Sequence, residues 1–189
     1  NVVGNALIYL IYPPHAERSI REPLEAACRE GGSTLFVNGI DPGFSGDVLP
    51  LTALQMSDQV EEIRVQEICD YSTYEDPEFT GVAFGFGKGP DAEPIMSLPG
   101  VLASGWGGML KVVAEAIGVE IEEIREVYER DYAKEDFECP MMSVAKGACG
   151  AVHFEVQGIV NGKPLLVAEH VNRLGLEQAP HDLPGVLNR

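Results

Sequence analysis

The sequence is short of positive charge and has no long apolar run. Its 189 residues include 30 Asp and Glu but only 13 Lys and Arg, which gives a formal net charge of −17. Phosphate backbones and anionic membrane surfaces repel such a chain. No segment approaches the roughly 20 apolar residues of a membrane span, and no basic segment followed by an apolar one marks a signal peptide. We therefore expect a cytoplasmic protein that binds neither nucleic acid nor membranes.

Recognisable metal, disulfide and catalytic motifs are also missing. The four cysteines, at positions 28, 69, 139 and 149, have no CxxC spacing and read as reduced packing residues. No GxSxG, HExxH or GxGxxG motif occurs. Gly85–Gly89 is glycine-rich but lacks the GK[ST] ending of a phosphate loop. We expect no metal cofactor.

The stretch 34–51 reads as a buried strand that turns sharply into a helix. Asn38-Gly39 ends the apolar run, and Asp41-Pro42 has the composition of a helix start, with Asp41 as N-cap and Pro42 at the first helical position. Gly43 and Gly46 in a first turn indicate that something packs closely against the backbone. The exposed N–H groups of such a turn bind carboxylates, phosphates or polarised carbonyls, although an ordinary strand-to-helix turn has the same spacing.

Apolar spacing predicts the remaining elements. We expect a buried strand over 1–12 and a helix from the capping box Ser19–Glu22 to Gly31-Gly32. A mostly buried helix should follow residue 41, then a strand over 60–74, a long glycine- and proline-rich loop over 75–100, a helix over 101–117 and a strand from about residue 124.

Asn161-Gly162 between two β-rich runs predicts a type I′ hairpin of 150–160 with 163–174. In a two-residue turn, paired residues have numbers that sum to 323, which would place His153 opposite His170 with Glu155 on the same face. Two imidazoles and a carboxylate are weak candidates for a divalent metal site or a proton shuttle. A polar hairpin surface with no ligand explains the same residues.

Four polar or aromatic residues leave the end of the strand over 60–74 together: Glu67, Asp70, Tyr71 and Tyr74. With Phe44 they can line a pocket, in which the phenols orient a carbonyl or an amine and the rings enclose it. Ordinary core tyrosines at a strand end are the competing interpretation.

Several segments resemble a known family in matching order: NVV near residue 2, LFVNGIDPGF at 35–44, VQEICDYSTY at 65–74 and AEHVNR at 168–173. The chain resembles the carboxyl-terminal domain of the dihydrodipicolinate reductase-like enzymes that include 2,4-diaminopentanoate dehydrogenase and the native amine dehydrogenases. The resemblance implies an α+β (α/β) fold with an open mixed β-sheet, a C-terminal antiparallel hairpin and helices on one face. It also implies a homodimer, and NAD(P)H held mainly by a Rossmann domain outside this chain.

The resemblance assigns roles to individual residues. Tyr71 and Tyr74 match pocket-lining positions and are the expected catalytic residues. Asp41, Gly43, Phe44, Glu67 and Phe79 are expected to join them in binding substrate. Gly39, Asp41 and Pro42 are expected beside the nicotinamide. Residues 1–14 would be the end of a preceding nucleotide-binding domain or a crossover, and 15–189 the substrate-binding and oligomerisation domain.

Two positions depart from the family. Aspartate stands at 41 in place of asparagine, and Leu7-Ile8 stand where the amine-forming branch carries a glutamate. We therefore expect part of an NAD(P)-dependent reductase that transfers hydride to a C=O, C=N or C=C group of a small apolar substrate. Two alternatives stay open. One is a non-catalytic binding or assembly module, and the other is a metal-dependent hydrolase that uses His153 and His170.

Overall fold

The computed structural model describes residues 1–175, and these divide into two compact units. The first unit comprises 1–65, 102–125 and 156–168, and the second comprises 66–101, 126–155 and the described residues from 169 onward. The last residues of the domain predicted over 15–189, 176–189, lie outside the described part. No helix within 1–175 is long and apolar enough to cross a membrane.

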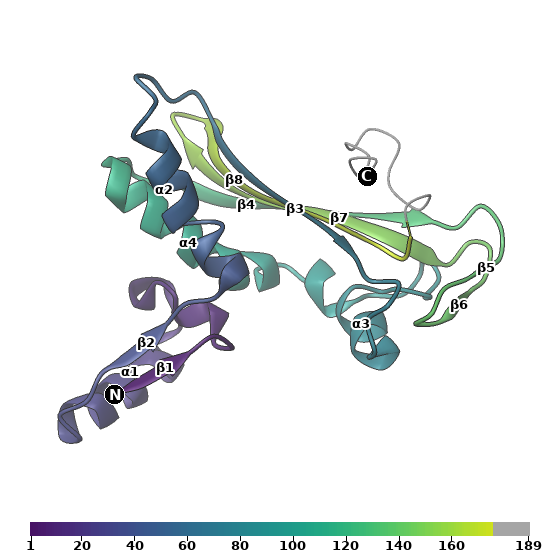
Figure 1. Ribbon diagram of the computed structural model, residues 1–189, viewed down its shortest axis with the longest axis horizontal. Helices are drawn as coiled ribbons and strands as arrows, with labels where there is room; N and C mark the ends of the chain where they lie inside the picture. Colours follow the sequence, from purple (N-terminus) through teal and green to yellow (C-terminus); the bar gives the residue numbers. More distant parts are fainter. Residues whose placement is uncertain (176–189) are drawn as a thin grey trace. The chain divides into compact units, whose positions relative to one another are not determined.

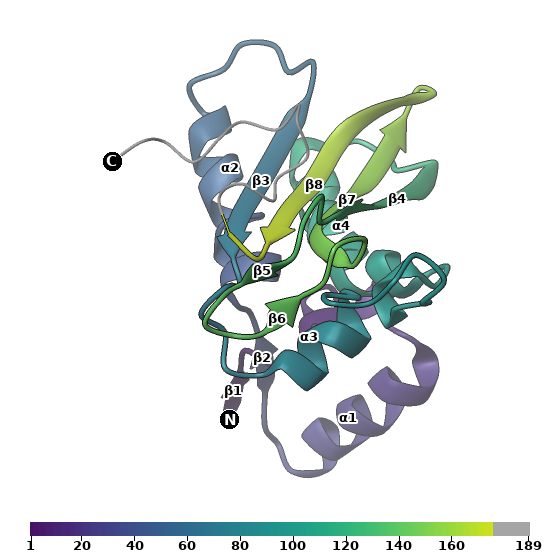
Figure 2. The same cartoon turned by 90° about the vertical axis from the view of Figure 1, so that its right-hand side faces the viewer.

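A four-stranded mixed sheet has the strand order β3-β8-β7-β4 (Figures 1 and 2). Its strands are β3 (Ile63–Asp70), β4 (Glu123–Tyr132), β7 (Cys149–Val160) and β8 (Lys163–Arg173). β3 and β8 point the same way in Figure 2, whereas β7 and β8 form the antiparallel hairpin. The predicted fold class, an open mixed sheet with helices and a C-terminal hairpin, is confirmed.

The first unit contains a β-α-β element at its start. Strand β1 (Val2–Gly4) pairs in parallel with β2 (Leu35–Val37), and α1 (Arg18–Glu30) connects them after two short 3-10 turns at Ile8–Leu10 and Pro13–His15. The predicted buried strand over 1–12 is wrong, because β1 is only three residues long and Val3 is 79% exposed. The predicted α1 is confirmed, but its N-cap is Glu17, to which the Ser19 hydroxyl donates a hydrogen bond.

The predicted helix start at Asp41 is wrong. Ile40–Phe44 forms a wide, π-type turn with non-helical dihedral angles at Asp41, Pro42 and Gly43, and the Asp41-Pro42 bond is cis. Helix α2 begins only at Val48, where the Asp47 carboxylate caps the first backbone N–H, and it ends at Leu54. A proline and two glycines within five residues favour a turn over a helical first turn. α2 is not buried either: Val48 and Leu49 are about half exposed.

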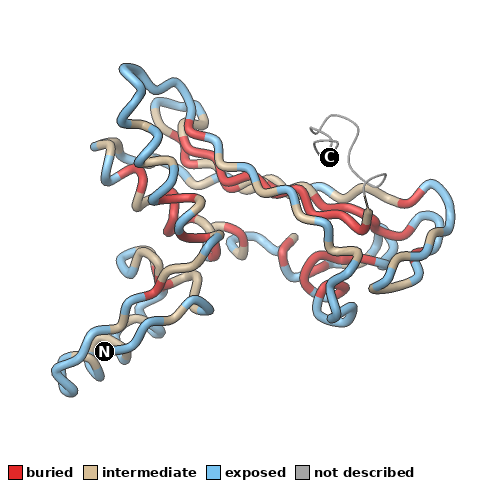
Figure 3. The backbone as a smooth tube through the Cα atoms, viewed as in Figure 1, coloured by how far each residue is buried: buried red, intermediate tan, exposed pale blue. Residues whose placement is uncertain are grey.

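Helix α4 (Val101–Ile117) matches its prediction and supplies much of the core of the first unit. Met109, Leu110 and Val113 are almost fully buried, and the left-handed Gly118 follows the helix end. In Figure 1, α2 and α4 lie along the same face of the hairpin end of the sheet, and Figure 3 shows the buried backbone concentrated in α4 and in the central strands.

The second unit contains short elements that the sequence patterns did not reveal. The stretch predicted as a loop over 75–100 contains α3 (Pro77–Ala83), capped by the Asp76 carboxylate, and a 3-10 turn at Ile95–Ser97. A small antiparallel pair, β5 (Phe137–Glu138) with β6 (Ser143–Val144), follows β4. Pro77 and Gly81 within α3 masked its helical spacing.

The hairpin of β7 and β8 is confirmed, and Asn161 and Gly162 both have the positive φ angles of its predicted turn. The predicted pairing is wrong by one residue. A Cβ atom on Gly158 would lie 3.3 Å from the Cβ of Leu166, and the Phe154 ring stacks on the His170 ring. The residues of each of these two pairs share a face of the sheet. The hairpin therefore has one residue more between Gly158 and Leu166 than a regular two-residue hairpin. His170 therefore lies on the face opposite to the one that we predicted.

Gly46 is the point at which the predicted close packing occurs. A Cβ atom added to Gly46 would overlap the Met109 thioether, and Met109 is fully buried, so its side chain has little room to move. We expect Gly46→Ala to lower the free energy of unfolding by about 1–3 kcal/mol, as other overpacked core sites do. Urea denaturation of the purified chain measures this. Gly89→Ala is the matched control, because a Cβ there meets nothing within 4 Å.

The double variant Gly46→Ala/Met109→Ala tests the cause of that loss. If overlap with Met109 is responsible, the two substitutions together will cost less than the sum of the single costs. Additive costs would show that Gly46 is needed for another reason.

Burial raises the pKa of the Cys149 thiol to about 12, so this thiol stays protonated at neutral pH. Its side chain is fully buried, whereas Cys28, Cys69 and Cys139 are partly exposed. We expect iodoacetamide at pH 8 to alkylate Cys149 only after the chain is unfolded, as measured by peptide mass mapping. Alkylation of Cys149 in the native chain as fast as that of Cys28 would contradict this packing.

Candidate functional site

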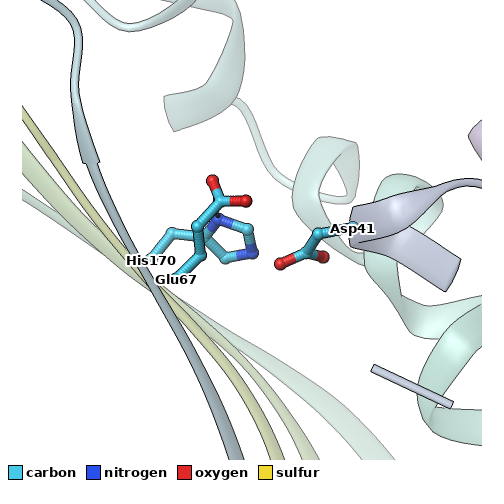
Figure 4. Close-up of side chains that lie close together, drawn as sticks. All are labelled: Asp41, Glu67 and His170. Atoms are coloured by element: carbon cyan, nitrogen blue, oxygen red, sulfur yellow. Dashed lines mark ion pairs between the residues drawn. The ribbon is translucent and has the colours of Figure 1, made fainter. Parts of the chain in front are cut away.

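The second unit contains a buried histidine held by a carboxylate. His170 of β8 is only 3% exposed, and its ring stacks on Phe154 with a centroid distance of 4.4 Å and an interplanar angle of 9°. The His170 Nδ1 lies 3.5 Å from the Glu67 Oε1 of β3 (Figure 4). The Glu67 side chain is 38% exposed, so the pair reaches from the interior toward solvent. Asp41, which Figure 4 also draws, belongs to the first unit.

Strand geometry explains why these two residues meet. In β3, Ile63, Val65, Glu67 and Cys69 alternate with more exposed residues, as the sequence predicted. β8 is the neighbouring strand, and the Tyr71 N–H donates to the Arg173 carbonyl at 2.7 Å just beyond the Glu67–His170 pair. Residue numbers rise together along the two strands, which is parallel pairing. Glu67 and His170 therefore project from neighbouring strands on one face.

The thiol beside Glu67 is kept neutral. Burial, followed by the negative charges of Glu67 and Asp70, raises the pKa of Cys69. A thiol in such surroundings is a poor nucleophile. On this face Cys69 is therefore not a candidate nucleophile.

Tyr71 and Tyr74, the predicted catalytic residues, lie together directly after β3. Their ring centroids are 5.4 Å apart, and the Tyr71 ring also packs against Phe84 at 5.1 Å and Phe86 at 5.9 Å. Phe86 is 1% exposed, whereas Tyr74 is 45% exposed and lines a shallow depression with residues 73, 75 and 76. The structure thus provides a rigid aromatic cluster with one phenol open to solvent.

Asn172, which follows His170 by two residues on the same strand face, was not predicted as a site residue. It is 1% exposed, and neither its amide oxygen nor its amide nitrogen has a hydrogen-bond partner. A buried amide without partners is costly, and such groups concentrate where a ligand or water completes the bonding. The sequence offered no signal for Asn172, because its burial depends on the strand order.

Phe79, predicted to bind substrate, belongs to α3. Its backbone N–H donates to the Asp76 carboxylate at 2.9 Å, and its side chain is 53% exposed.

The remaining predicted residues lie in the first unit, in the turn over 38–44. The Trp106 indole N–H donates to the Asp41 carboxylate at 2.9 Å. Pro42 and Gly43 are buried, and Phe44 is 50% exposed. Gly43 has φ +142°, and a Cβ there would overlap the Asn38 amide oxygen; a Cβ on Gly39 would lie 2.9 Å from the Pro42 carbonyl. The turn is therefore tightly packed and presents an apolar ring at its surface.

A cavity of about 240 Å³ in the first unit contains none of the predicted site residues. Leu10, Leu24, Cys28, Leu35 and Val37 are among its lining residues, and its surface is mostly apolar. It lies between α1, β2 and the 3-10 turns.

The predicted pairing of His153 with His170 is wrong. His153 Nε2 lies 3.1 Å from the Glu169 carboxylate, and His170 stacks on Phe154, so the two histidines project from opposite faces of the sheet. The one-residue offset of the hairpin is the cause. A metal site or a hydrolytic centre that shares both imidazoles is excluded by this geometry.

Two known proteins are similar to the chain over most of its length. It is 42% identical over 180 residues to an amine dehydrogenase of Streptomyces virginiae, an alignment that covers 95% of this chain and 50% of that protein. The solved structure of an amine dehydrogenase from Mycobacterium smegmatis superposes with a TM-score of 0.68 and 13% identity, over 90% of this chain and 50% of that one. No family model matches.

The chain spans about half the length of the curated relative that it matches. The solved structure, at its low identity, supports the fold, and the curated relative supports the kinship that the motifs at 35–44, 65–74 and 168–173 suggested. The chain is therefore similar in sequence to about half of one amine dehydrogenase and in fold to about half of another.

Proposed function

We propose that this chain is the substrate-binding part of an NAD(P)-dependent oxidoreductase that transfers hydride to a C=N group formed from a small, largely apolar carbonyl compound and ammonia. The observation that carries the proposal is the 42% identity to an amine dehydrogenase over 95% of the chain. Reduction of a C=O or C=C group, which the sequence also allowed, is the less supported version. The geometry of the second unit is compatible with the C=N reaction.

His170 and Glu67 supply the proton chemistry in this proposal. With Glu67 beside Nδ1, the imidazole of His170 is the group that gives and takes the proton. Imine formation needs a proton on the hydroxyl group that leaves as water, and the attacking ammonia must lose one. Glu67 stabilises the imidazolium between these transfers and fixes the ring orientation.

The Asn172 side chain can bind the intermediate formed when ammonia adds to the carbonyl compound, which carries both an amino and a hydroxyl group. Its amide oxygen accepts from an N–H, and its amide N–H₂ donates to an oxygen, so one ligand can satisfy both orphaned groups. Tyr74 and the aromatic cluster of Tyr71, Phe84 and Phe86 supply the apolar wall expected for a small apolar substrate.

The turn over 38–44 fits the nicotinamide end of the cofactor. It is tightly packed around Gly39 and Gly43 and presents an exposed aromatic ring at Phe44, which suits contact with a flat heterocycle. It contains no Lys or Arg to hold phosphates, so we propose that the phosphate groups are held by a domain outside this chain. Bound there, the cofactor would supply the hydride.

The small-molecule substrate, the homodimer and the cytoplasmic location stay predictions. A non-catalytic assembly module is the competing function. Leu7-Ile8, the departure that motivated it, have packing roles in the first unit: Leu7 packs against the core of Leu10, Ala16 and Val37, and a Cβ on Gly105 would lie 3.4 Å from Ile8. The substitution of a family glutamate there is therefore compatible with a folded, active protein whose proton chemistry lies at His170.

The full-length protein should oxidise NADH or NADPH in the presence of ammonia and a small ketone or aldehyde. We expect His170→Gln to lower kcat/KM by about 10²–10⁴-fold, the usual contribution of a general acid–base. Glu67→Gln should lower it less and shift the pH profile, because the ring remains but its orientation is lost. Spectrophotometric assay across pH 6–10 measures both.

Glu62→Gln is the matched control, because Glu62 is an exposed carboxylate just before β3 that pairs with Arg64. Glu67 is itself partly exposed, so its loss should cost under about 1 kcal/mol of stability. Loss of activity in folded Glu67→Gln would therefore report chemistry. Wild-type protein that oxidises neither nucleotide with any carbonyl substrate would favour the assembly module.

Substitutions of Asp41 test whether this aspartate has the same structural role as the asparagine that the family carries at this position. Both residues present a side-chain oxygen to the Trp106 indole N–H, so Asp41→Asn should keep the free energy of unfolding within about 0.5 kcal/mol. Asp41→Ala should cost about 1–3 kcal/mol, because the part-buried N–H loses its acceptor. Thermal and urea denaturation measure the pair, and equal costs for both variants would show that the hydrogen bond is irrelevant.

A further inference from the structure

A second cluster of ionisable side chains lies on the sheet face opposite His170. His153 and Glu155 come from β7, Glu169 from β8 and Glu129 from β4, and all four belong to the second unit. The side chains of His153, Glu155 and Glu169 are only 12%, 13% and 6% exposed. This is a mixed set of imidazole and carboxylate groups in a largely buried place, and the proposed reaction does not use it.

One distance within the cluster matches that between ligand atoms of a coordination shell, and the others are somewhat longer. His153 Nε2 lies 3.1 Å from the Glu169 Oε1 and 3.9 Å from the Glu155 Oε1, and ligand atoms of the three residues all lie within 4.8 Å of one another. Around a cation with metal–ligand bonds of about 2.0–2.2 Å, neighbouring ligand atoms are about 3–3.5 Å apart. Small rotamer changes would bring all three atoms to one ion.

Glu129 presets the imidazole for this role. Its carboxylate lies 3.1 Å from His153 Nδ1, the nitrogen that points away from Glu155 and Glu169. If Nδ1 carries the proton and donates to Glu129, Nε2 presents a lone pair. A metal-bound histidine usually donates its other ring N–H to a carboxylate in this way.

The same arrangement is unfavourable without a cation. A neutral imidazole has one N–H, yet both nitrogens of His153 lie 3.1 Å from a carboxylate oxygen. In one of the two contacts, a ring nitrogen without a proton then faces a negatively charged oxygen, unless a second proton or a metal ion lies between them.

We propose that His153, Glu155 and Glu169 bind a divalent transition-metal ion, such as Mn²⁺, Fe²⁺, Co²⁺ or Zn²⁺, with Glu129 orienting the histidine. One imidazole nitrogen and two carboxylate oxygens suit these ions, and the two carboxylates balance the charge of the ion. The site ties β7 to β8 on the face away from His170, so its role is structural. Its ligands differ from the pair His153–His170 that the sequence suggested.

Metal titration of the full chain tests the proposal. Protein dialysed against EDTA and then against metal-free buffer is titrated with CoCl₂, followed by visible absorption, and with MnCl₂ and ZnCl₂, followed by calorimetry. We expect one saturable site per chain and a higher melting temperature with the bound ion. His153→Gln and Glu155→Gln should each weaken binding by at least about 100-fold, and Glu129→Gln by about 10–100-fold.

Glu123→Gln is the matched control, because Glu123 is an exposed carboxylate of β4 outside the cluster. It should leave the affinity unchanged, which separates the site from diffuse attraction of cations to a chain of net charge −17. Glu129 does not touch the ion, so its variant decides the case even if His153→Gln fails to fold.

Two results would overturn the proposal. Absence of saturable binding by the wild-type chain would show that the cluster is held together without a metal ion. Saturable binding that survives in both Glu155→Gln and Glu129→Gln would place the ion elsewhere.

Discussion

The pairing of β3, β8 and β7 decides which polar residues meet, and the proposed chemistry depends on it. In a strand, successive side chains project to opposite faces, so a shift of one residue moves every group to the other side. The extra residue between Gly158 and Leu166 is such a shift. It sends His170 to the face of Phe154 and Glu67, and His153 to the face of Glu169. Each histidine thereby gains its own carboxylate partners, and the two are separated by the thickness of the sheet.

This separation gives two sites of different character. His170 has the Glu67 carboxylate beside it, a stacked aromatic ring and an unsatisfied amide two residues away, which is an environment for moving a proton and binding a polar ligand. His153 has carboxylates at both ring nitrogens and little access to solvent, which is an environment for holding a cation. Burial raises the free-energy cost of every unpaired charge. The strands that carry the two histidines must therefore hold their carboxylate partners in place.

Much of the fold could be predicted from local patterns. The helix over 101–117, the hairpin turn at Asn161-Gly162 and the face of β3 that carries Glu67 follow from periodicity and turn chemistry, and the structure agrees. The predicted helix start at Asp41 was wrong. An N-cap residue followed by proline favours a helix, but Gly39 and Gly43 have the conformational freedom that a tight turn needs. The partnership of Glu67 with His170 could not be predicted, since it needs the strand order and the hairpin offset, neither of which local sequence contains. Tyr71 and Tyr74 were found together because they are close in sequence.

The account rests on the placement of the two imidazoles on opposite faces. Side-chain NMR of the chain, with nuclear Overhauser effects between aromatic protons, measures this placement directly. We expect contacts between the rings of His170 and Phe154, and none between the rings of His153 and His170. A direct contact between the two imidazoles would restore the pairing of a two-residue hairpin without an offset and would contradict both sites.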